Sequence, residues 1–575
     1  MIFHLKSSFI ASITLFFSSL LMFSFATYLN HISMTWPISW EICSINSSII
    51  NFPIIFDPMG TLFASTVLLI SANVMLFAST YMAEEIFLTR FIILVLLFVL
   101  SMNMLIFFPH LMTLLLGWDG LGLTSFILVI YYQNAKSLGA GMITALTNRI
   151  GDVTLLVAIG WTLNNNHWSI MNMWFNPMSN LIILCITIAA MTKSAQMPFS
   201  SWLPAAMAAP TPVSALVHSS TLVTAGVFLI IRFYDFLSSF YLFTPILLLT
   251  ASFTMFMAGL SAMTECDLKK IIALSTLSQL GVMMASLALG YPKLAFFHLI
   301  THALFKALLF ICAGSIIHFH QHGQDLRTIG NLTNQLPFTM SCMLIANMSL
   351  CAAPFLSGFY SKDLILELSL FNPLNYTISL MFFCATTFTA AYSVRMTLTA
   401  IWSNNLASPN HFLSNHDMNM VLPITSLTLG AILAGASINW WISPMNLEPI
   451  LPMHLKFLPI SAMLLGIFFA WQTIVSFSTN LSFWQNNKMS HNASCLMWFM
   501  TPISTQSLIS TPYLLALHFQ KTLDNGWTEM SSAEGTFFSS FSISNLFIPI
   551  QKNQINSFAL LILILMPIIY FVNNS

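Results

Sequence analysis

Charge is scarce in this sequence. Of its 575 residues, 6% are Asp, Glu, Lys or Arg, whereas a soluble domain carries about 25%. Apolar residues make up 57%, so the chain cannot surround its core with a water-compatible surface, and lipid must be the solvent for most of it. The net charge is zero and no basic run occurs, which gives no support for a nucleic-acid partner.

Paired cysteines, phosphate loops and nucleophile motifs are also missing. The eight cysteines include no CxxC pair, so a zinc or iron–sulfur site is not predicted. No Gly-rich phosphate loop or nucleophile elbow occurs, which leaves the catalytic chemistry of soluble enzymes unsupported. Lys and Arg are rare while Met is common, with 36 residues, a bias that fits a protein encoded and inserted inside an organelle.

Long apolar runs are what the sequence does contain. A membrane helix needs about 20 mostly apolar residues, and the first run is longer than the apolar region of a cleaved signal peptide, so it is predicted to be a retained span. About fifteen spans are predicted on this criterion, at residues 7–28, 58–80, 87–108, 110–132, 137–161, 178–204, 212–234, 243–263, 269–290, 293–318, 337–370, 376–402, 418–441, 456–480 and 557–573.

Two longer polar gaps separate the spans, at residues 29–57 and 481–556. The last part of the second gap, from about Asn525 to Asn553, mixes polar and apolar residues before a final apolar span. This pattern predicts a long helix along the membrane surface, with a plain connecting loop as the alternative.

Two spans contain proline in mid-course, one within Met191–Pro198 and the other within Ala353–Asp363. Proline removes a backbone donor and clashes with the preceding turn, so the freed carbonyls need other partners in lipid. Two interrupted helices at corresponding places in two halves indicate an internally repeated transporter, although tolerated kinks would give the same pattern. Lys193 and Lys362 lie beside the two breaks, which favours a functional origin.

Ionisable side chains within the spans are the candidate functional residues, because they are costly in lipid and usually mark ion paths or proton relays. His298, His302 and Lys306 recur every four residues, which places them on one helical face over about 12 Å. The row predicts a proton path, or else polar groups that merely tie helices together. The full set of candidates is Asp119, Arg149, Asp152, Lys193, His218, Arg232, Asp267, His298, His302, Lys306, Lys362, Asp363 and Arg395.

Lys193 and Asp119 are predicted to form a switchable ion pair. At about 4 Å and an effective dielectric near 20, such a pair is worth about 4 kcal/mol before desolvation. Moving one charge across 100 mV costs about 2.3 kcal/mol, so making and breaking the pair is the right size to drive a proton against a membrane potential. The alternative is a static pair that pins two helices. Arg149 and Asp152, three residues apart, are predicted to pair within one helix.

Seven short motifs follow one another along the chain. They are Asn148–Asp152, Thr192–Gln196, Trp202–Pro204, Pro210–Thr221, Asp267–Ala273, Ser278–Gly281 and Gly358–Asp363. These motifs resemble those of the antiporter-like subunits of respiratory complex I. Their order and spacing are similar to those of the chain 5 family of mitochondrial NADH:ubiquinone oxidoreductase, from about residue 40 to the C-terminus.

The resemblance implies an all-α polytopic membrane protein with two inverted five-helix repeats, each containing one broken helix. In the C-terminal extension, the helix near 525–556 would be a lateral amphipathic helix and 557–573 its anchoring span. The implied organisation is N-terminal helices and a loop at 1–86, a first repeat at 87–234, a second repeat at 243–402, further spans at 418–480 and the extension at 481–575.

The resemblance also implies a function. The chain would be a core membrane-arm subunit of an H+-translocating NADH:ubiquinone reductase in the mitochondrial inner membrane. NADH, FMN, iron–sulfur clusters and ubiquinone would be bound by other subunits, and this chain would contact neighbouring antiporter-like subunits and membrane lipids. A cation/proton antiporter subunit of the same superfamily and a structural scaffold are the alternatives.

The resemblance implies a role for each candidate on the proton path. Lys193 would be the central protonatable group, with Asp119 as its switching partner. His218 would pass the proton inward, His298, His302 and Lys306 would continue the path, and Lys362 with Asp363 would serve near the exit.

The sequence departs from the usual pattern of this family in three places, all of which resemble invertebrate mitochondrial members. Asp119 stands where Glu is usual, and it is one methylene shorter. Ala208 and Ala209 stand where an acidic residue and Gly are common. The first span resembles the second span of the family, which implies that one N-terminal helix of the family pattern is missing from this sequence.

Overall fold

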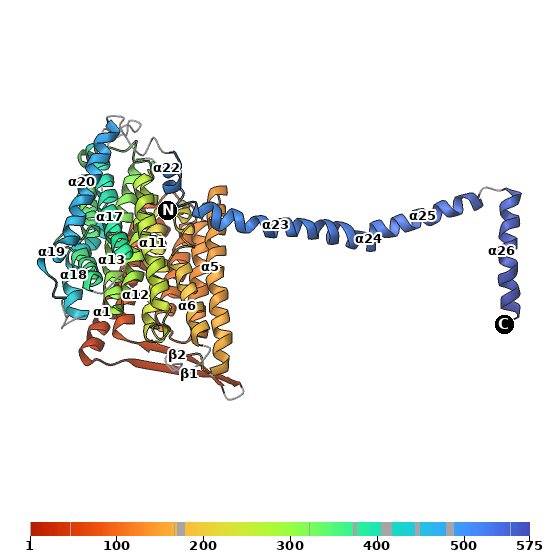
Figure 1. The fold of residues 1–575 in the computed structure, drawn as a ribbon, viewed down its shortest axis with the longest axis horizontal. Coiled ribbons are helices and arrows are strands. Elements are labelled where there is room, and N and C mark those ends of the chain that lie inside the picture. The colour runs from red at the N-terminus through yellow and green to blue at the C-terminus, as the bar shows by residue number, and fades with distance from the viewer. Residues whose placement is uncertain are drawn as a thin grey trace. The chain divides into compact units, whose positions relative to one another are not determined.

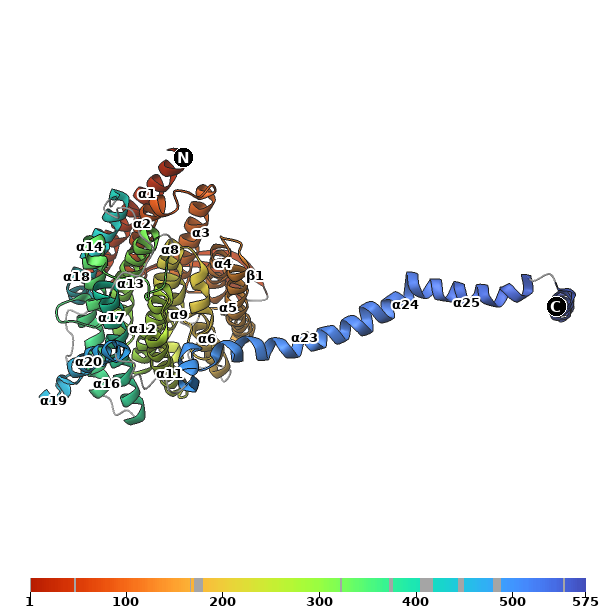
Figure 2. The same cartoon turned by 90° about the horizontal axis from the view of Figure 1, so that it is seen from above.

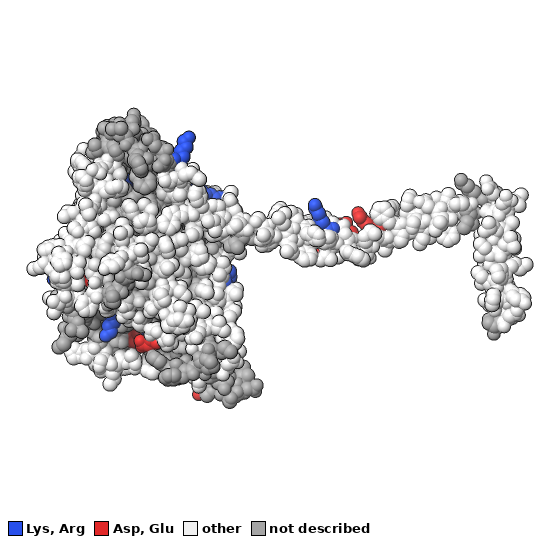
Figure 3. All heavy atoms as spheres, viewed as in Figure 1, with Lys and Arg blue, Asp and Glu red and all other residues white. Residues whose placement is uncertain are grey.

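The computed structural model describes the chain except for residues 1, 46–47, 166, 170–178, 321–322, 372–375, 404–416, 443–448, 479–487, 552–553 and 575. The chain divides into two compact units, residues 1–501 and 502–575. In the first unit the long helices run alongside one another, and a two-stranded hairpin lies across one end of them (Figures 1 and 2). Very few charged side chains reach the face drawn in Figure 3, as a lipid-facing surface requires.

The predicted spans are confirmed as helices over the described residues. Twelve helices are long and apolar enough to cross a membrane, and three shorter apolar helices, 179–193, 337–350 and 458–473, account for the other predicted spans. The long helices of the first unit are α1 (Ile2–Ile32), α2 (Pro58–Tyr81), α3 (Leu88–Phe107), α4 (Leu111–Val129), α5 (Ala135–Thr162), α6 (Ser179–Lys193), α9 (Leu222–Arg232), α11 (Phe243–Thr264), α12 (Leu268–Ala288), α13 (Pro292–Phe319), α15 (Pro337–Leu350), α17 (Tyr376–Trp402), α18 (Met418–Ile442) and α20 (Leu458–Ser478).

Short helical segments join these helices. They are η1 (Leu163–Asn165), α7 (Trp202–Ala205), η3 (Ala206–Ala208), α8 (Thr211–Val213), η4 (Ser214–Thr221), α10 (Tyr234–Leu237), α14 (Leu332–Gln335), η5 (Phe359–Asp363), α16 (Leu364–Phe371), α19 (Met453–Lys456) and α22 (Lys488–Cys495). Two of them, η4 and η5, carry candidate residues. The first residue of predicted span 178–204 and the last two of span 456–480 lie outside the described residues.

The centre of the first unit is formed by α12, α13 and the stretch 211–232, whose apolar windows are buried throughout. Helices α1, α3 and α5 lie at the periphery and expose large apolar side chains such as Phe17, Ile93 and Val153. Apolar exposure of this kind suits lipid. The polar side chains of α12 and α13 therefore lie in the protein interior and away from lipid.

The polar gap 29–57 contains a hairpin that the sequence analysis did not predict. Strands β1 (Trp36–Ile45) and β2 (Ser48–Phe56) pair antiparallel, with an irregularity between Glu41 and Cys43. Isoleucine and aromatic residues favour a strand, and the ring of Phe56 packs 5.1 Å from that of Phe107 at the end of α3. The fold is mostly helical as predicted, and among the described residues this hairpin is the strand-forming exception.

The second unit is helical through most of its described length. Its elements are η6 (Pro502–Gln506), α23 (Ser507–Phe519), η7 (Gln520–Thr528), α24 (Glu529–Ser531), α25 (Ala533–Gln551) and α26 (Ile555–Asn573). The predicted surface helix is confirmed as a helix, but the helical run begins at residue 502 and not near residue 525. The run passes through Gly526 because wide π-type turns accommodate residues 520–528. It is interrupted at Ser532, and a Cβ at Gly535 would lie 1.5 Å from the Met530 carbonyl oxygen. Residues 552–553, at the end of the predicted helix, lie outside the described residues.

Candidate functional site

The first broken helix, α6, ends at Lys193 with a Schellman-type cap. Ala195 adopts the left-handed conformation, with φ of 53°. The amides of Ala195 and Gln196 donate to the carbonyls of Thr192, at 3.3 Å, and Met191, at 3.0 Å. This pair of bonds satisfies carbonyls that the end of a helix leaves open. The chain then turns away, so Lys193 is the last residue of the span and is held in the protein interior.

The second broken helix, α15, ends in the same way at Leu350. Ala352 has φ of 64°, and the amides of Ala352 and Ala353 donate to the carbonyls of Ser349, at 3.2 Å, and Met348, at 3.0 Å. The two caps have identical spacing, which supports the correspondence between the two breaks. The division of the chain into two inverted repeats stays a prediction.

A glycine lies against each broken end. A Cβ at Gly226 of α9 would lie 2.4 Å from the carbonyl oxygen of Ala190, and one at Gly358 would lie 1.8 Å from that of Ser349. Two non-bonded heavy atoms do not approach this closely in a packed protein, so no side chain would fit at either glycine. Glycine at these two positions therefore lets a second stretch of backbone approach the helix end and fix it in place.

Lys193 is completely buried, and its ammonium donates to the carbonyl oxygen of Trp118 at 2.6 Å. The same nitrogen lies 4.0 Å from the centroid of the Trp118 ring. The predicted direct pair with Asp119 is not formed, since no ion pair within 4.0 Å joins these two described residues. Successive helical side chains point about 100° apart, and Asp119 is directed to Arg149, 3.9 Å away.

Arg149 lies between two carboxylates. The predicted pair with Asp152 is confirmed at 3.1 Å, although Arg149 remains 52% exposed in this chain and only Asp152, at 8%, is buried. Asp152 and then Asp119 exert the largest electrostatic attraction on Lys193. From the sequence, Asp152 is predicted to pair with Arg149 alone, whereas in the structure its charge acts on Lys193 as well.

His218 lies on η4, a stretch of π-type turns next to the first break. It is 1% exposed, and neither ring nitrogen has a hydrogen-bond partner among the described residues. The ring centroid of Trp202, just beyond the break, lies 6.2 Å away. Buried polar groups are normally paired, so His218 needs water or a movable neighbour to satisfy it, as a proton-transfer group does.

The predicted row on α13 is confirmed as a buried face. His298, His302 and Lys306 are all fully buried, and the rings of His298 and His302 lie 6.2 Å apart. His302 has no hydrogen-bond partner on either nitrogen within the described chain. Lys306 donates sideways, to the hydroxyl of Ser275 on α12, at 2.5 Å. Hydrogen bonds therefore do not run along the row.

His298 also bonds away from the row. Its Nδ1 lies 2.9 Å from the Ser361 hydroxyl on η5, and its Nε2 lies 3.2 Å from Oε1 of Gln279 on α12. Which nitrogen donates depends on the tautomer. His298 thus joins the central helix α12 to the segment that follows the second break.

Lys362, on η5, occupies the second break. It is 2% exposed and donates to the carbonyl of Leu350 at 3.2 Å and to the hydroxyl of Thr389 on α17 at 3.0 Å. Leu350 ends α15, where the helix dipole favours a cation. Asp363 follows Lys362 on the same turn and is partly buried, so the placement agrees with the predicted grouping, while the exit role stays a prediction.

Comparison with known proteins gives a consistent match along the chain. Residues 109–389 match the family model described as NADH:quinone oxidoreductase/Mrp antiporter, TM. Residues 392–573 match NADH dehydrogenase subunit 5 C-terminus, and residues 40–92 match NADH-ubiquinone oxidoreductase (complex I), chain 5 N-terminus. The NADH-ubiquinone oxidoreductase chain 5 of Lumbricus terrestris is 52% identical, with 92% of each chain covered. This chain belongs to the NADH-ubiquinone oxidoreductase chain 5 family.

More distant chain 5 proteins match over similar lengths. The chain 5 of Anopheles gambiae is 48% identical, over 92% of this chain and 91% of its own. That of Rattus norvegicus is 36% identical, over 93% and 88%. A chain of the solved Mrp complex from Dietzia sp. DQ12-45-1b has a TM-score of 0.68 at 23% identity, and the match covers 90% of this chain and 61% of that one. At this level of identity, the match to the Mrp chain shows a shared fold and nothing more.

Ala209, one of the positions noted as a departure in the sequence, contacts a buried lysine. Lys269, only 5% exposed, donates to the carbonyl oxygen of Ala209 at 3.2 Å. A backbone acceptor thus binds the Lys269 ammonium here.

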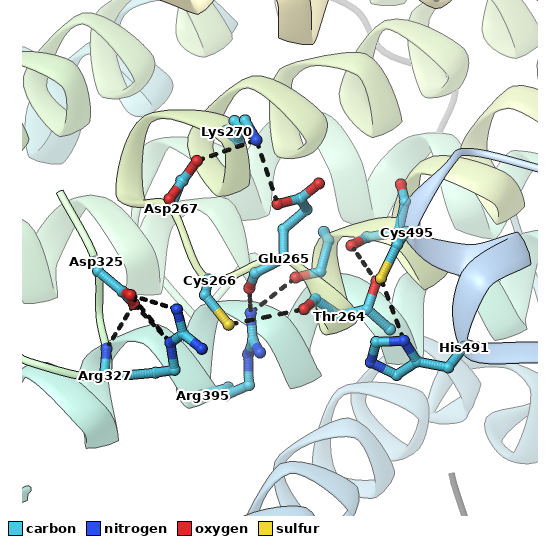
Figure 4. Close-up of polar contacts among 12 residues, drawn as sticks. Thr264, Glu265, Cys266, Asp267, Lys270, Asp325, Arg327, Arg395, His491 and Cys495 are labelled. Carbon is cyan, nitrogen blue, oxygen red and sulfur yellow. Dashed lines mark hydrogen bonds and ion pairs between the residues drawn. The ribbon is translucent and has the colours of Figure 1, made fainter. Parts of the chain in front are cut away.

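The remaining charged candidates anchor helix ends. Arg395 donates to the backbone carbonyls of Ala262 and Glu265, which end α11, while Lys270 pairs with Asp267 at 3.0 Å (Figure 4). Burial raises the pKa of Glu265, a shift that the charge of Lys270 opposes. These contacts favour a structural role for this group.

Arg232 forms an ion pair that the sequence analysis missed. Its guanidinium binds both carboxylate oxygens of Asp57 and donates to the Ile106 carbonyl at 3.0 Å. The pair joins the end of α9 to the start of α2 and the end of α3. Asp57 precedes a span and resembles a solvated cap in the sequence, so no local signal distinguishes it.

Proposed function

We propose that this chain is a proton-translocating subunit of the membrane arm of complex I, in the mitochondrial inner membrane. NADH oxidation and ubiquinone reduction in other subunits would supply the driving force, which makes the chain part of an H+-translocating NADH:ubiquinone reductase. The observation that carries the proposal is Lys193, fully buried at a broken helix with two carboxylates in electrostatic range. Membership of the chain 5 family supports the assignment to complex I.

Arg149 gives the proposed switch its mechanism. Arg149 pairs with Asp152 and Asp119, so neither carboxylate forms an ion pair with Lys193. The Lys193 ammonium instead donates a hydrogen bond to the Trp118 carbonyl. If either carboxylate moves from Arg149 to Lys193, the charged form of Lys193 is stabilised, and the return movement favours release of its proton. A pair worth about 4 kcal/mol at effective dielectric 20 exceeds the roughly 2.3 kcal/mol needed for one charge at 100 mV.

The other buried ionisable groups provide the proposed continuation. His218 and His302 have no partner on either nitrogen among the described residues, so each is free to accept a proton from one side and release it to the other. His298, Lys306 and Lys362 are bonded to hydroxyl groups, which both donate and accept. Asp363 is proposed to serve near the exit.

Cofactors and redox partners belong to other subunits in this proposal. No group of three or more His, Cys, Asp or Glu side chains is placed for a metal in the described part of the chain, and the eight cysteines are free thiols. NADH, FMN, iron–sulfur clusters and ubiquinone are proposed to bind elsewhere in the complex. The helical run from 502 to 551 exposes many large apolar side chains and is proposed to lie against neighbouring antiporter-like subunits and lipid.

Replacing Lys193 with Ala tests the proposal. We expect proton transport by the reconstituted complex to be lost while assembly holds, since Ala cannot carry a proton. Lys136→Ala, at an exposed lysine of α5, is the matched control and should leave transport unchanged. Normal transport by an assembled Lys193→Ala complex would show that the chain acts as a scaffold only.

A cation/proton antiporter subunit is the second candidate, because the solved Mrp chain has the same fold. The match of residues 392–573 to the subunit 5 C-terminus favours complex I. Purification under native conditions separates the two: flavin and iron–sulfur proteins should accompany the chain. If flavin and iron–sulfur proteins are absent, and the purified assembly exchanges cations for protons in response to a membrane potential, the chain is an antiporter subunit instead.

A further inference from the structure

The proposed path needs a connection between Lys306 and Lys362 that the α13 row does not supply. His302, the next member of the row, has no hydrogen-bond partner on either nitrogen among the described residues. Lys306 instead donates to Ser275, so the hydrogen bond leads away from α13 and into α12.

A buried tyrosine of α17 meets that hydrogen bond. The Tyr392 side chain is 1% exposed, and its hydroxyl lies 3.2 Å from that of Ser278. Ser275 and Gln279, one turn apart on the same face of α12, are further polar neighbours of the Tyr392 hydroxyl. One phenol oxygen thus faces three polar side chains of α12, including the acceptor of Lys306. Packing alone would not require a hydroxyl here, because phenylalanine fills nearly the same volume.

The same helix, α17, reaches Lys362. Thr389 accepts from Lys362 at 3.0 Å and lies three residues before Tyr392, so the two side chains share a face of α17. Cys351, the residue after Leu350, has its thiol 2.9 Å from the hydroxyl of Ser393, the residue after Tyr392. Tyr392 therefore contacts the face of α12 that binds Lys306 and shares the face of α17 that binds Lys362.

We propose that Tyr392 carries the proton between Lys306 and Lys362, through Ser275 on one side and the Thr389 face of α17 on the other. The inference rests on the proposed proton-translocating function. The Lys306 ammonium gives a proton to Ser275 as the Ser275 hydroxyl proton passes to the Tyr392 oxygen. Tyr392 releases its own phenolic proton toward Thr389, and the neutral Lys362 amine accepts a proton. One proton leaves Lys306, one arrives at Lys362, and the hydroxyl groups end as they began.

Tyr392→Phe in the assembled, membrane-reconstituted complex tests this step, because it removes the hydroxyl and keeps the ring. We expect proton flux to fall by about 100-fold, the lower end of the range for losing a proton-transfer group, with the amount of assembled complex unchanged. The flux ratio between H2O and D2O should also rise, because proton transfer then limits the rate. Tyr131→Phe is the control, since the Tyr131 hydroxyl is buried without a hydrogen-bond partner among the described residues.

Two results would overturn the inference. One is a flux for Tyr392→Phe equal to that of Tyr131→Phe. The other is a reduced flux with an unchanged isotope ratio and less assembled complex, which identifies Tyr392 as a packing residue. Lys306→Ala in the same membranes separates this failure from that of the proposed function. If Lys306→Ala stops transport while Tyr392→Phe does not, only the Tyr392 step is wrong, whereas normal transport in both variants contradicts a proton path here altogether.

Discussion

The ammonium of Lys193 donates to the carbonyl oxygen of Trp118 at 2.6 Å, one residue before the carboxylate expected to pair with it. A backbone carbonyl cannot move away from a helix as a carboxylate can. Control of the Lys193 charge must therefore come from the neighbouring side chains of Asp152 and Asp119, and from Arg149, which pairs with both of them.

Asp152→Asn should impair proton transport more than Asp119→Asn. Asp152 is the more buried carboxylate, lies closer to Arg149, and exerts the stronger electrostatic effect on Lys193. We expect a difference of about tenfold in flux, which corresponds to about 1.4 kcal/mol. Flux measurements on reconstituted variants check this order, and a larger loss for Asp119→Asn would restore Asp119 as the principal partner.

Asp119→Glu should retain transport. The added methylene extends a side chain that is 33% exposed and 3.9 Å from Arg149, so there is room for it, and the charge is preserved. Proton flux through the reconstituted complex is the measurement. Asp119→Asn, which lacks the charge, is measured for comparison. Complete loss of transport in Asp119→Glu would contradict the placement of this carboxylate.

Gly226→Ala should destabilise the first break. The new Cβ would lie 2.4 Å from the Ala190 carbonyl, and overpacking of this kind costs about 1–3 kcal/mol. Thermal unfolding of the purified complex should show a lower transition temperature. Gly122→Ala on α4 is the matched control, because its Cβ would meet no atom within 4 Å. Equal behaviour of the two variants would mean that the packing around α6 is loose.

Asp57→Asn should reduce the stability of the first unit. The change leaves Arg232, whose side chain is 8% exposed, without a charged partner, and breaking a buried pair costs about 3–5 kcal/mol. The yield of assembled complex and its unfolding temperature measure the effect. Arg327→Ala, which removes the exposed pair with Asp325, is the control and should change neither quantity. An unaltered Asp57→Asn complex would indicate that Arg232 is held by the Ile106 carbonyl alone.

Glu265→Gln should be tolerated, whereas Arg395→Met should not. Burial raises the pKa of Glu265, so ionisation of this carboxyl disfavours the folded state. This unfavourable contribution to the free energy of unfolding is absent below the pKa that Glu265 has in the unfolded chain. It grows as the pH rises through the higher pKa that Glu265 has in the folded protein. Glutamine removes it, and the Arg395 contact survives because its acceptor is the backbone carbonyl. Thermal unfolding across pH 4 to 8, a range around the ordinary Glu pKa of about 4.3, should show a weaker decline for Glu265→Gln. A large destabilisation by this variant would assign the anchoring role to the carboxylate.

The sequence by itself determined the membrane environment, the spans and the two breaks. Apolar runs, proline positions and i, i+4 spacing are local properties, and a helix in lipid must satisfy its own backbone, so local pattern decides helix placement. The buried face of His298, His302 and Lys306 follows from the same spacing. The motifs added the family and the functional expectation.

Only the tertiary structure decided which groups meet. Lys193 and Trp118 are 75 residues apart, and Arg232 and Asp57 are 175 apart, and no periodicity encodes such contacts. Helix packing turned Asp119 toward Arg149, brought Asp152 within range of Lys193, and placed the Tyr392 phenol against the Ser278 hydroxyl of α12. The physical reason is that side-chain direction is fixed by the helix, while the partner in that direction depends on how whole helices pack.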